Sequence, residues 1–258
     1  MIQERLDILK DEAYARISGF PPLHLQVKSG YSSTGRFKSS GETFFRWLIS
    51  LGNLKPYERV LDVGCGAGCL ALPLRRYLTP AAGSYEGIDI LSKAIMWCRR
   101  YVTRDYPNFR FTLCDVANPK YNPWGSVPAG TYTFPYADNS FDVVCVKSLF
   151  PHMKTDAMAA YIHQIRRVLK PRGRCLMTLF LINTESRKRK PSRFAHQYGD
   201  YFTSYPFRHE EDIAYEETGL ITLLREHGLN IHGPVHYGSW SGRKYFLGYQ
   251  DLIIVIKE

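Results

Sequence analysis

The sequence predicts an α/β fold built around a doubly wound sheet of mainly parallel strands. Three short apolar runs carry an aspartate at or near their end, and these acids stand at positions 62, 89 and 115. The intervals of 27 and 26 residues suit one strand, one helix and two loops of a βαβ unit. Such a sheet binds ligands beyond the carboxyl ends of its strands, so we expect all three acids at the ligand edge.

The other elements follow from apolar periodicity and from turn residues. Strands are expected at Val60–Val63, Ser84–Ile90, Arg110–Val116 and Phe141–Lys147, after the turn Lys170–Gly173, near Leu229–Tyr237 and at Gln250–Ile256. Helices are expected at 2–17, Glu42–Ser50, Leu70–Leu78, Ser92–Arg104 and Glu216–His227. The glycine-punctuated stretch Gly30–Gly41 is expected to be a loop, either solvated or folded over a ligand as a lid. Pro171 is expected to end the helix before the fifth strand, with Gly173 in the tight turn between them.

The segment Val60–Gly68 combines a buried strand, an acid at the strand tip and a glycine-rich turn. Glycines stand at 64, 66 and 68, where missing Cβ atoms would let a ligand touch the backbone. The free N–H groups of such a turn, and of the helix after it, suit a nucleoside-type cofactor. A dinucleotide fingerprint reads G-x-G-x-x-G/A, but here Cys69 fills the third slot and the third glycine comes one residue early. The spacing therefore favours the pattern D-x-G-x-G-x-G.

This pattern resembles the first motif of class I S-adenosylmethionine (SAM)-dependent methyltransferases. Two further stretches, Phe134–Val144 and Arg167–Met177, look like the entry to the fourth strand and the helix stop before the fifth in small-molecule members of that class. The family usually has glycine where this chain has Arg172. The resemblance covers about residues 58–182 and implies a Rossmann-like, seven-stranded sheet that is mostly parallel with a reversed C-terminal strand.

The resemblance also implies SAM as cofactor, with S-adenosylhomocysteine as product, and assigns residues to it. Asp89 would accept the two ribose hydroxyls, and Asp115, with Val116 beside it, would accept from the adenine amino group. Asp62 would hold the glycine turn or face the amino end of the methionine moiety. The other expected cofactor contacts are Tyr31, Gly64, Cys65, Gly66, Gly68, Ile90, Lys147 and Ser148.

Methyl transfer to a hydroxyl also needs a proton acceptor, and His152 is the expected base. It follows the fourth strand, in a segment that flanks the transferred methyl in related small-molecule enzymes, and a histidine titrates near neutral pH. A helix-capping or structural role is its alternative. Three other histidines remain open as bases: His196, His209 and His236. Acceptor contacts are expected from insertions at 117–133 and 183–215 and from the loop before the last strand, namely Tyr121, Asn122, Trp124, His196, Trp240 and Arg243.

The composition favours one domain. At 258 residues with 45% hydrophobic residues, the chain is expected to form a single domain, 1–258, with an N-terminal helical cap or lid over 1–50 that is also a candidate homodimer contact. No apolar run approaches the length of a membrane span. Six cysteines, three of them in expected buried strands, favour free thiols and the cytoplasm. No metal site is expected, because the pair Cys65 and Cys69 lacks a partner pair.

The net charge is +10, and five cations lie between Arg187 and Arg193. We interpret this run as a solvated loop on the ligand side that would steer an anionic acceptor. The expected function is SAM-dependent methylation of a small molecule, anionic or aromatic in character, most simply at a hydroxyl oxygen; nitrogen and carbon acceptors stay open. The alternatives are an RNA methyltransferase that uses 187–193 as its nucleic-acid footprint and a non-catalytic SAM-binding scaffold.

Overall fold

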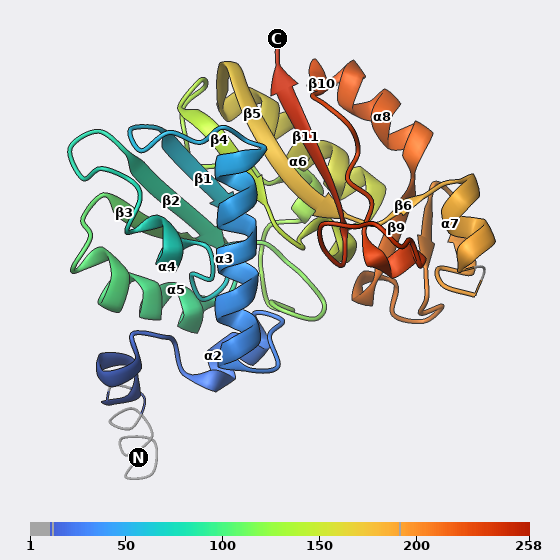
Figure 1. The fold of residues 1–258 in the computed structure, drawn as a ribbon. Coiled ribbons are helices and arrows are strands. Elements are labelled where there is room, and N and C mark those ends of the chain that lie inside the picture. The colour runs from blue at the N-terminus through green and yellow to red at the C-terminus, as the bar shows by residue number, and fades with distance from the viewer. Residues whose placement is uncertain (1–10, 12, 191) are drawn as a thin grey trace. The chain divides into compact units, whose positions relative to one another are not determined.

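A computed structural model describes residue 11, residues 13–190 and residues 192–258. The chain divides into two compact units (Figure 1). The first holds the residues before Arg59 together with Cys65–Cys114, and the second holds Arg59–Gly64 and Asp115–Glu258. Whether these units act as the single expected domain 1–258 stays a prediction.

The first unit carries one parallel strand pair and short helices. β2 (Ser84–Asp89) pairs with β3 (Phe109–Leu113), which places Asp89 opposite Leu113. The helices are α2 (Leu23–Lys28), α3 (Thr34–Ser50), α4 (Ala71–Leu74) and α5 (Ser92–Cys98), and α5 continues as a π-helical turn over Arg99–Thr103. The helix expected at 2–17 falls mostly outside the described residues, of which 13–18 are helical.

Two of the predicted boundaries in this unit were wrong. The loop expected at Gly30–Gly41 is helical from Thr34, because the Ser33 side chain caps α3 by accepting the Arg36 N–H at 3.2 Å. Gly41 is a packing position: a Cβ there would lie 2.2 Å from the Cys69 carbonyl oxygen. The helix expected at Leu70–Leu78 is regular only over α4, and i→i+3 bonds follow Pro73.

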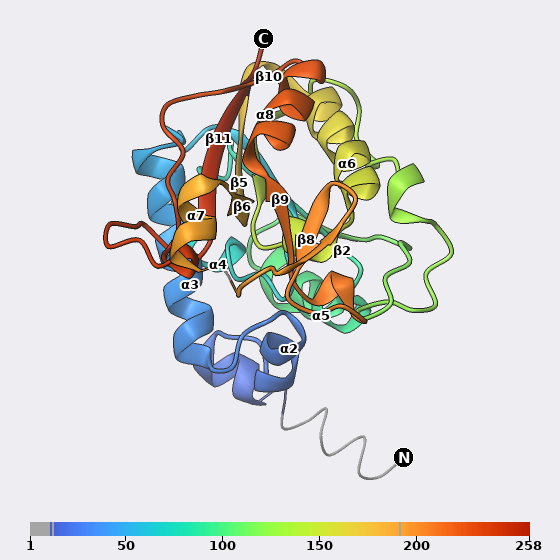
Figure 2. The ribbon, with the colours of Figure 1, turned by 90° about the vertical axis from the view of Figure 1, so that its right-hand side faces the viewer.

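The second unit holds the other strands of the main sheet. They are β1 (Arg59–Val63), β4 (Phe141–Val146), β5 (Leu169–Leu179), β10 (Leu229–Ile231) and β11 (Asp251–Lys257). β1 and β5 both pair in parallel with β4, whereas β11 is antiparallel to β5 and β10. α6 (Thr155–Val168) and α8 (Glu217–Glu226) lie on the same face of β5 and β11 (Figure 2).

The complete strand order is β10-β11-β5-β4-β1-β2-β3. This confirms the predicted α/β class, with seven mostly parallel strands and a reversed C-terminal strand. β11 is buried from Asp251 to Val255, which explains why its sequence is apolar and β-branched without alternation. Each of the six cysteines is buried and carries a thiol rather than a disulfide. In the part of the chain that the structure covers, every helix is too short or too polar to cross a bilayer.

The insertion at 183–215 folds into more than a loop. β6 (Leu181–Ile182), β9 (Ile213–Glu216), β8 (Tyr201–Thr203) and β7 (His196–Tyr198) form a second, four-stranded sheet in that order. Half of the predicted basic loop is helical: α7 (Thr184–Arg189) starts at a capping box between Asn183 and Ser186. The insertion at 117–133 has only a short 3₁₀ turn at Ala129–Thr131, in agreement with an ordered loop.

The turn into β5 differs from the prediction in detail. α6 ends at Val168 and β5 begins at Leu169, so the helix stops before Pro171 rather than at it. Arg172, which stands where glycine is usual, has a φ of +63°. A side chain in this left-handed region costs roughly 1–2 kcal/mol relative to an ordinary conformation. The tight turn is therefore retained with a residue that strains it.

Candidate functional site

The glycine turn is tied to the acid at the tip of β2. The Asp89 carboxylate accepts the Gly66 N–H at 2.6 Å and the Leu91 N–H at 2.9 Å, one on each oxygen. Burial raises the pKa of Asp89, and these backbone N–H groups oppose that rise. The Ile90 N–H is a third backbone donor to this carboxylate, whose two oxygens offer about four lone-pair sites in all. The pair is thus a fixed double acceptor beside the turn.

The fold itself requires glycine at the positions of the turn. Gly64, Gly66 and Gly68 all have positive φ, between +53° and +83°. A Cβ at Gly66 would lie 2.9 Å from Ser29 atoms, and one at Gly68 would lie 3.1 Å from the Cys98 sulfur. The Cβ positions of Gly66 and Gly68 therefore face neighbouring protein atoms, and contacts between the backbone of the turn and a cofactor stay a prediction. Glycine is required by the backbone conformation and by close packing.

Ser29 is a functional candidate that sequence reasoning missed. Its hydroxyl donates to the Leu25 carbonyl at 2.9 Å and accepts the Ala67 N–H at 3.1 Å. It thereby fixes the turn to the end of α2. Tyr31, two residues later, is half-buried and packs edge-on against Phe37 at 5.1 Å. The signal was weak, because one serine before a glycine also fits an ordinary helix end.

The other predicted cofactor contacts of the first unit lie around the same turn. Cys65 is buried, its N–H donates to the Ile88 carbonyl at 3.1 Å, and its sulfur lies 3.7 Å from the Gly66 carbonyl oxygen. Ile90 follows Asp89 and is half-buried. The structure thus brings Cys65, Gly66, Gly68, Asp89 and Ile90 together in one unit.

In the second unit, the insertion 117–133 folds back onto Asp115. The Asp115 carboxylate accepts from the Ser126 hydroxyl and from the Ser126 N–H, the latter at 3.3 Å. The Asn122 amide donates to the Val116 carbonyl at 3.0 Å. Asp115 is exposed and Val116 is buried. The adenine contacts expected of these two residues stay predictions, and Ser126 already occupies one side of the acid.

The remaining predicted cofactor residues line the ends of β1 and β4. Asp62 is buried within β1, and Gly64 follows that strand. Lys147 is half-buried just beyond β4. Ser148 takes a φ of +56°, donates its N–H to the Thr178 hydroxyl at 2.9 Å and donates its own hydroxyl to Gln250 at 2.8 Å. A non-glycine residue held in this conformation at a strand end is typical of a functional site.

His152 has a defined tautomer. It lies in the 3₁₀ turn Phe150–His152 after β4, and its Nδ1 is 2.8 Å from the Glu210 carbonyl oxygen. A carbonyl oxygen only accepts, so Nδ1 carries the proton and Nε2 holds the lone pair of the neutral ring. Burial lowers the pKa of His152, and the positive charge of Lys120 adds to this; the Glu210 hydrogen bond acts in the opposite direction. The neutral ring therefore dominates near pH 7, with Nε2 ready to accept a proton.

The insertions supply the surroundings of this histidine. Tyr121 packs edge-on against the His152 ring at 5.5 Å. Lys120 donates to Glu211 at 2.5 Å and lies 5.2 Å from the Tyr121 ring centre. The structure thus brings the predicted acceptor contact Tyr121 next to the predicted base His152. Beside them, Lys120 is paired with Glu211, which lies 91 residues later in the sequence.

Tyr215 holds the turn that carries His152. Its hydroxyl lies 2.6 Å from both the Phe150 and the Met153 carbonyl oxygens, so one proton is shared between two acceptors. The ring is buried, and burial raises the pKa of Tyr215 well above its usual value. Sequence reasoning missed this residue, because nothing local marks a strand tyrosine as the partner of a turn more than 60 residues earlier.

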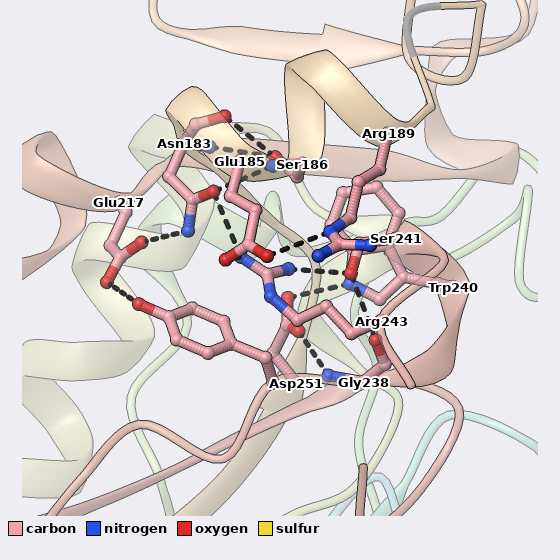
Figure 3. A network of polar contacts seen from close by, with 11 residues as sticks. Asn183, Glu185, Ser186, Arg189, Glu217, Gly238, Trp240, Ser241, Arg243 and Asp251 are labelled. Carbon is pink, nitrogen blue, oxygen red and sulfur yellow. Dashed lines mark hydrogen bonds and ion pairs between the residues drawn. The ribbon is translucent and has the colours of Figure 1, made fainter. Parts of the chain in front are cut away.

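The other predicted acceptor contacts are scattered. Trp124 and His196 are exposed, and Asn122 is engaged with Val116. Trp240 is buried against Phe180 and Phe194, and its indole N–H donates to Asp251 at 2.8 Å. Arg243 is bound by the Asn183 amide oxygen at 3.1 Å and by Glu185 at 3.3 Å (Figure 3). Trp240 and Arg243 are already engaged in the fold, and an acceptor role for any of these five residues stays a prediction.

The basic run 187–193 is partly neutralised by its own neighbours. Arg187 pairs with Glu216 at 2.7 Å, Arg189 with Glu185 at 2.8 Å and Arg193 with Asp212 at 2.7 Å. Three of its five cations are therefore committed to ion pairs, which weakens the run as a nucleic-acid footprint.

Comparisons with known proteins point to one family. Residues 60–173 match the family profile described as Methyltransferase domain. An uncharacterized methyltransferase of Schizosaccharomyces pombe is 28% identical over 122 residues, which are 46% of this chain and 39% of that protein. Nocamycin O-methyltransferase of Saccharothrix syringae is 31% identical over 152 residues, 56% of this chain and 47% of that protein. The chain thus spans less than half the length of these two curated relatives.

The solved structures agree on the fold. A SAM-dependent methyltransferase of Methanosarcina mazei superposes with a TM-score of 0.54 at 24% identity, over 81% of this chain and 96% of that one. At this identity the likeness supports the fold alone.

Proposed function

We propose that this chain, which carries a class I SAM-dependent methyltransferase domain over residues 60–173, transfers a methyl group to a hydroxyl oxygen of a small molecule. SAM is the cofactor of this family. When bound, it supplies a methyl group that is activated by a positively charged sulfur.

The residues of the first unit fit this cofactor. Asp89 is a fixed carboxylate whose two oxygens each accept one backbone N–H, with the Ile90 N–H as a third backbone donor. Two adjacent ribose hydroxyls match that pair of acceptors. Gly66 and Gly68 have positive φ and pack against Ser29, at the end of α2, and Cys98 of α5. The turn is therefore in place before a ligand binds, which lowers the entropic cost of binding.

The observation that carries the proposal is the hydrogen bond between His152 Nδ1 and the Glu210 carbonyl. It leaves Nε2 as the proton acceptor, and burial keeps the ring neutral. An acceptor hydroxyl must lose its proton as the new carbon–oxygen bond forms, and Nε2 can take it. A positioned base of this kind is worth roughly 100- to 10,000-fold in rate.

Two observations support a small hydroxyl acceptor over RNA. The relative from Saccharothrix syringae is named as an O-methyltransferase of nocamycin. The basic run that would bind RNA spends Arg187, Arg189 and Arg193 on internal ion pairs.

The test is to follow labelled methyl from SAM into separated fractions of a cell extract. The wild-type chain should label the low-molecular-mass fraction, and the labelled product should have lost one exchangeable hydroxyl proton. His152→Ala should not label it above background. Label that appears in the RNA fraction, and that salt suppresses steeply, would replace this proposal by RNA methylation.

A further inference from the structure

The loop between the 3₁₀ turn Ser239–Ser241 and β11 exposes a contiguous set of large apolar side chains. The exposed fractions are 92% for Tyr245, 55% for Phe246, 44% for Leu247 and 56% for Tyr249. Single exposed apolar residues are normal, but neighbouring ones mark an interaction surface. Figure 2 shows this loop, in red before β11, as a projecting turn. We call residues 243–249 the aromatic loop.

The aromatic loop is held rigidly at its base. The Ser239 N–H donates to the Gly248 carbonyl at 2.9 Å, and the Trp240 N–H donates to the Tyr249 carbonyl at 3.1 Å. The buried Asp251 carboxylate accepts the Gly238 N–H at 2.6 Å and the Trp240 indole N–H at 2.8 Å (Figure 3). Both ends of the loop are thus fixed by hydrogen bonds, which lowers the ordering cost of binding.

Lysines without an ion-pair partner accompany this loop. α7 packs against its base, because a Cβ at Gly242 would lie 3.2 Å from the Lys190 side chain. Of the cations on α7 and the loop, Arg187, Arg189 and Arg243 are paired with Glu216 or Glu185. The others have no acidic partner among the described residues and are exposed: Lys188, Lys190 and Lys244.

We propose that the aromatic loop and these lysines dock the protein onto an anionic phospholipid surface. Tyrosine and phenylalanine partition into the interfacial region of a bilayer, and lysines beside them are attracted by anionic headgroups. A second copy of the chain fits less well. A twofold contact through this surface would bring the same lysines face to face. This inference concerns a different part of the molecule from His152 and Asp89 and goes beyond the proposed function.

Vesicle co-sedimentation of the full chain tests it. We expect binding to phosphatidylcholine vesicles that contain about 30% phosphatidylglycerol, and at least tenfold weaker binding to phosphatidylcholine alone. The double variant Tyr245→Ser/Phe246→Ser should bind the anionic vesicles at least about tenfold more weakly. Lys190→Gln/Lys244→Gln should lose affinity and most of the salt dependence. Phe207→Ser is the matched control, since Phe207 is 96% exposed outside the loop, and it should bind like wild type.

Three results would overturn the proposal. One is equal binding of the wild type to neutral and anionic vesicles. Another is unchanged binding of the Tyr245→Ser/Phe246→Ser variant, with its fold verified by an unchanged thermal midpoint. The third is sedimentation velocity without lipid that shows a dimer which the same variant dissociates, because the loop would then be a contact between copies.

Discussion

The glycine turn of the first unit and the His152 turn of the second are assembled in opposite ways. Asp89 and Gly66 are 23 residues apart and meet because consecutive strands of a βαβ unit end at the same edge. His152 and Glu210 are 58 residues apart, and Tyr215 reaches Phe150 across 65 residues. A site built from neighbouring elements is visible in a motif, whereas one built by an insertion is visible only in the folded chain.

The largest expected effect concerns the His152 turn. His152→Ala should lower kcat roughly 100- to 10,000-fold and leave SAM affinity unchanged, because it removes only the proton acceptor. Turnover with labelled SAM and calorimetric titration measure the two quantities. His232→Gln, at an exposed histidine of the same unit without a proposed role, should keep wild-type turnover. If His152→Ala retained full turnover, no base would be needed at this position.

A substitution of Asp89 tests the role of the glycine turn in cofactor binding. Asp89→Ala should weaken SAM binding by roughly 1.5–3 kcal/mol, the usual value of hydrogen bonds to a charged group. Asp105→Asn is the matched control, because Asp105 is an exposed acid of the same unit that pairs with Arg104. Calorimetric titration measures the SAM affinity of both variants. Equal affinities would contradict the assignment of Asp89.

Tyr215→Phe should weaken the support of the His152 turn. Removal of the hydroxyl deprives the buried Phe150 and Met153 carbonyls of their shared donor, at a cost of about 1–3 kcal/mol in the free energy of unfolding. Because the histidine then loses its fixed orientation, kcat should fall while SAM affinity stays constant. Denaturant unfolding and turnover distinguish this from a purely structural loss, in which kcat of the folded enzyme would not change.

The pH profile follows from the direction of the His152 shift. A base must be unprotonated, and burial lowers the pKa of His152 below its ordinary value of about 6.5. The acidic limb of the activity profile should therefore be centred below pH 6.5. Tyr215→Phe should move this acidic limb upward, toward 6.5. A wild-type limb centred above 6.5 would contradict the burial argument.

The smallest expected effect is a gain in stability. Arg172→Gly should raise the free energy of unfolding by ~1 kcal/mol, since glycine adopts a φ of +63° without the steric cost that arginine bears. Arg174→Gly, in the strand itself, should destabilise the protein, since glycine in a strand interior is unfavourable. Denaturant midpoints of the two variants should therefore move in opposite directions, and a shift in the same direction would remove strain as the explanation.

The sequence predicted the parts of the fold that depend on short sequence patterns. The acids near the strand ends and the parallel order follow from local patterns, whereas the reversed last strand was implied by the family resemblance. The glycine-rich stretch 30–41 was misleading, because Gly41 serves helix packing, and the sequence also did not reveal that the Cβ positions of Gly66 and Gly68 face Ser29 and Cys98. Both outcomes depend on which atoms lie opposite the glycine, and these belong to other elements.

The sequence also could not predict the hydrogen-bond and ion-pair partners of individual side chains. The carbonyl that fixes the His152 tautomer belongs to Glu210, and any residue could supply a carbonyl, so no residue type marks it. The basic run was expected to be a solvated loop, but the capping box at Asn183 starts a helix that includes its first residues, up to Arg189. The acids that pair with the run are Glu185 in the first turn of that helix, Asp212 before β9 and Glu216 at the end of β9.

The measurement that tests the central claim most directly is a crystal structure of the protein with S-adenosylhomocysteine. We expect the ribose hydroxyls within hydrogen-bond distance of the Asp89 carboxylate. Nucleoside density that lies away from Asp89, or none at a millimolar concentration of the compound, would contradict it.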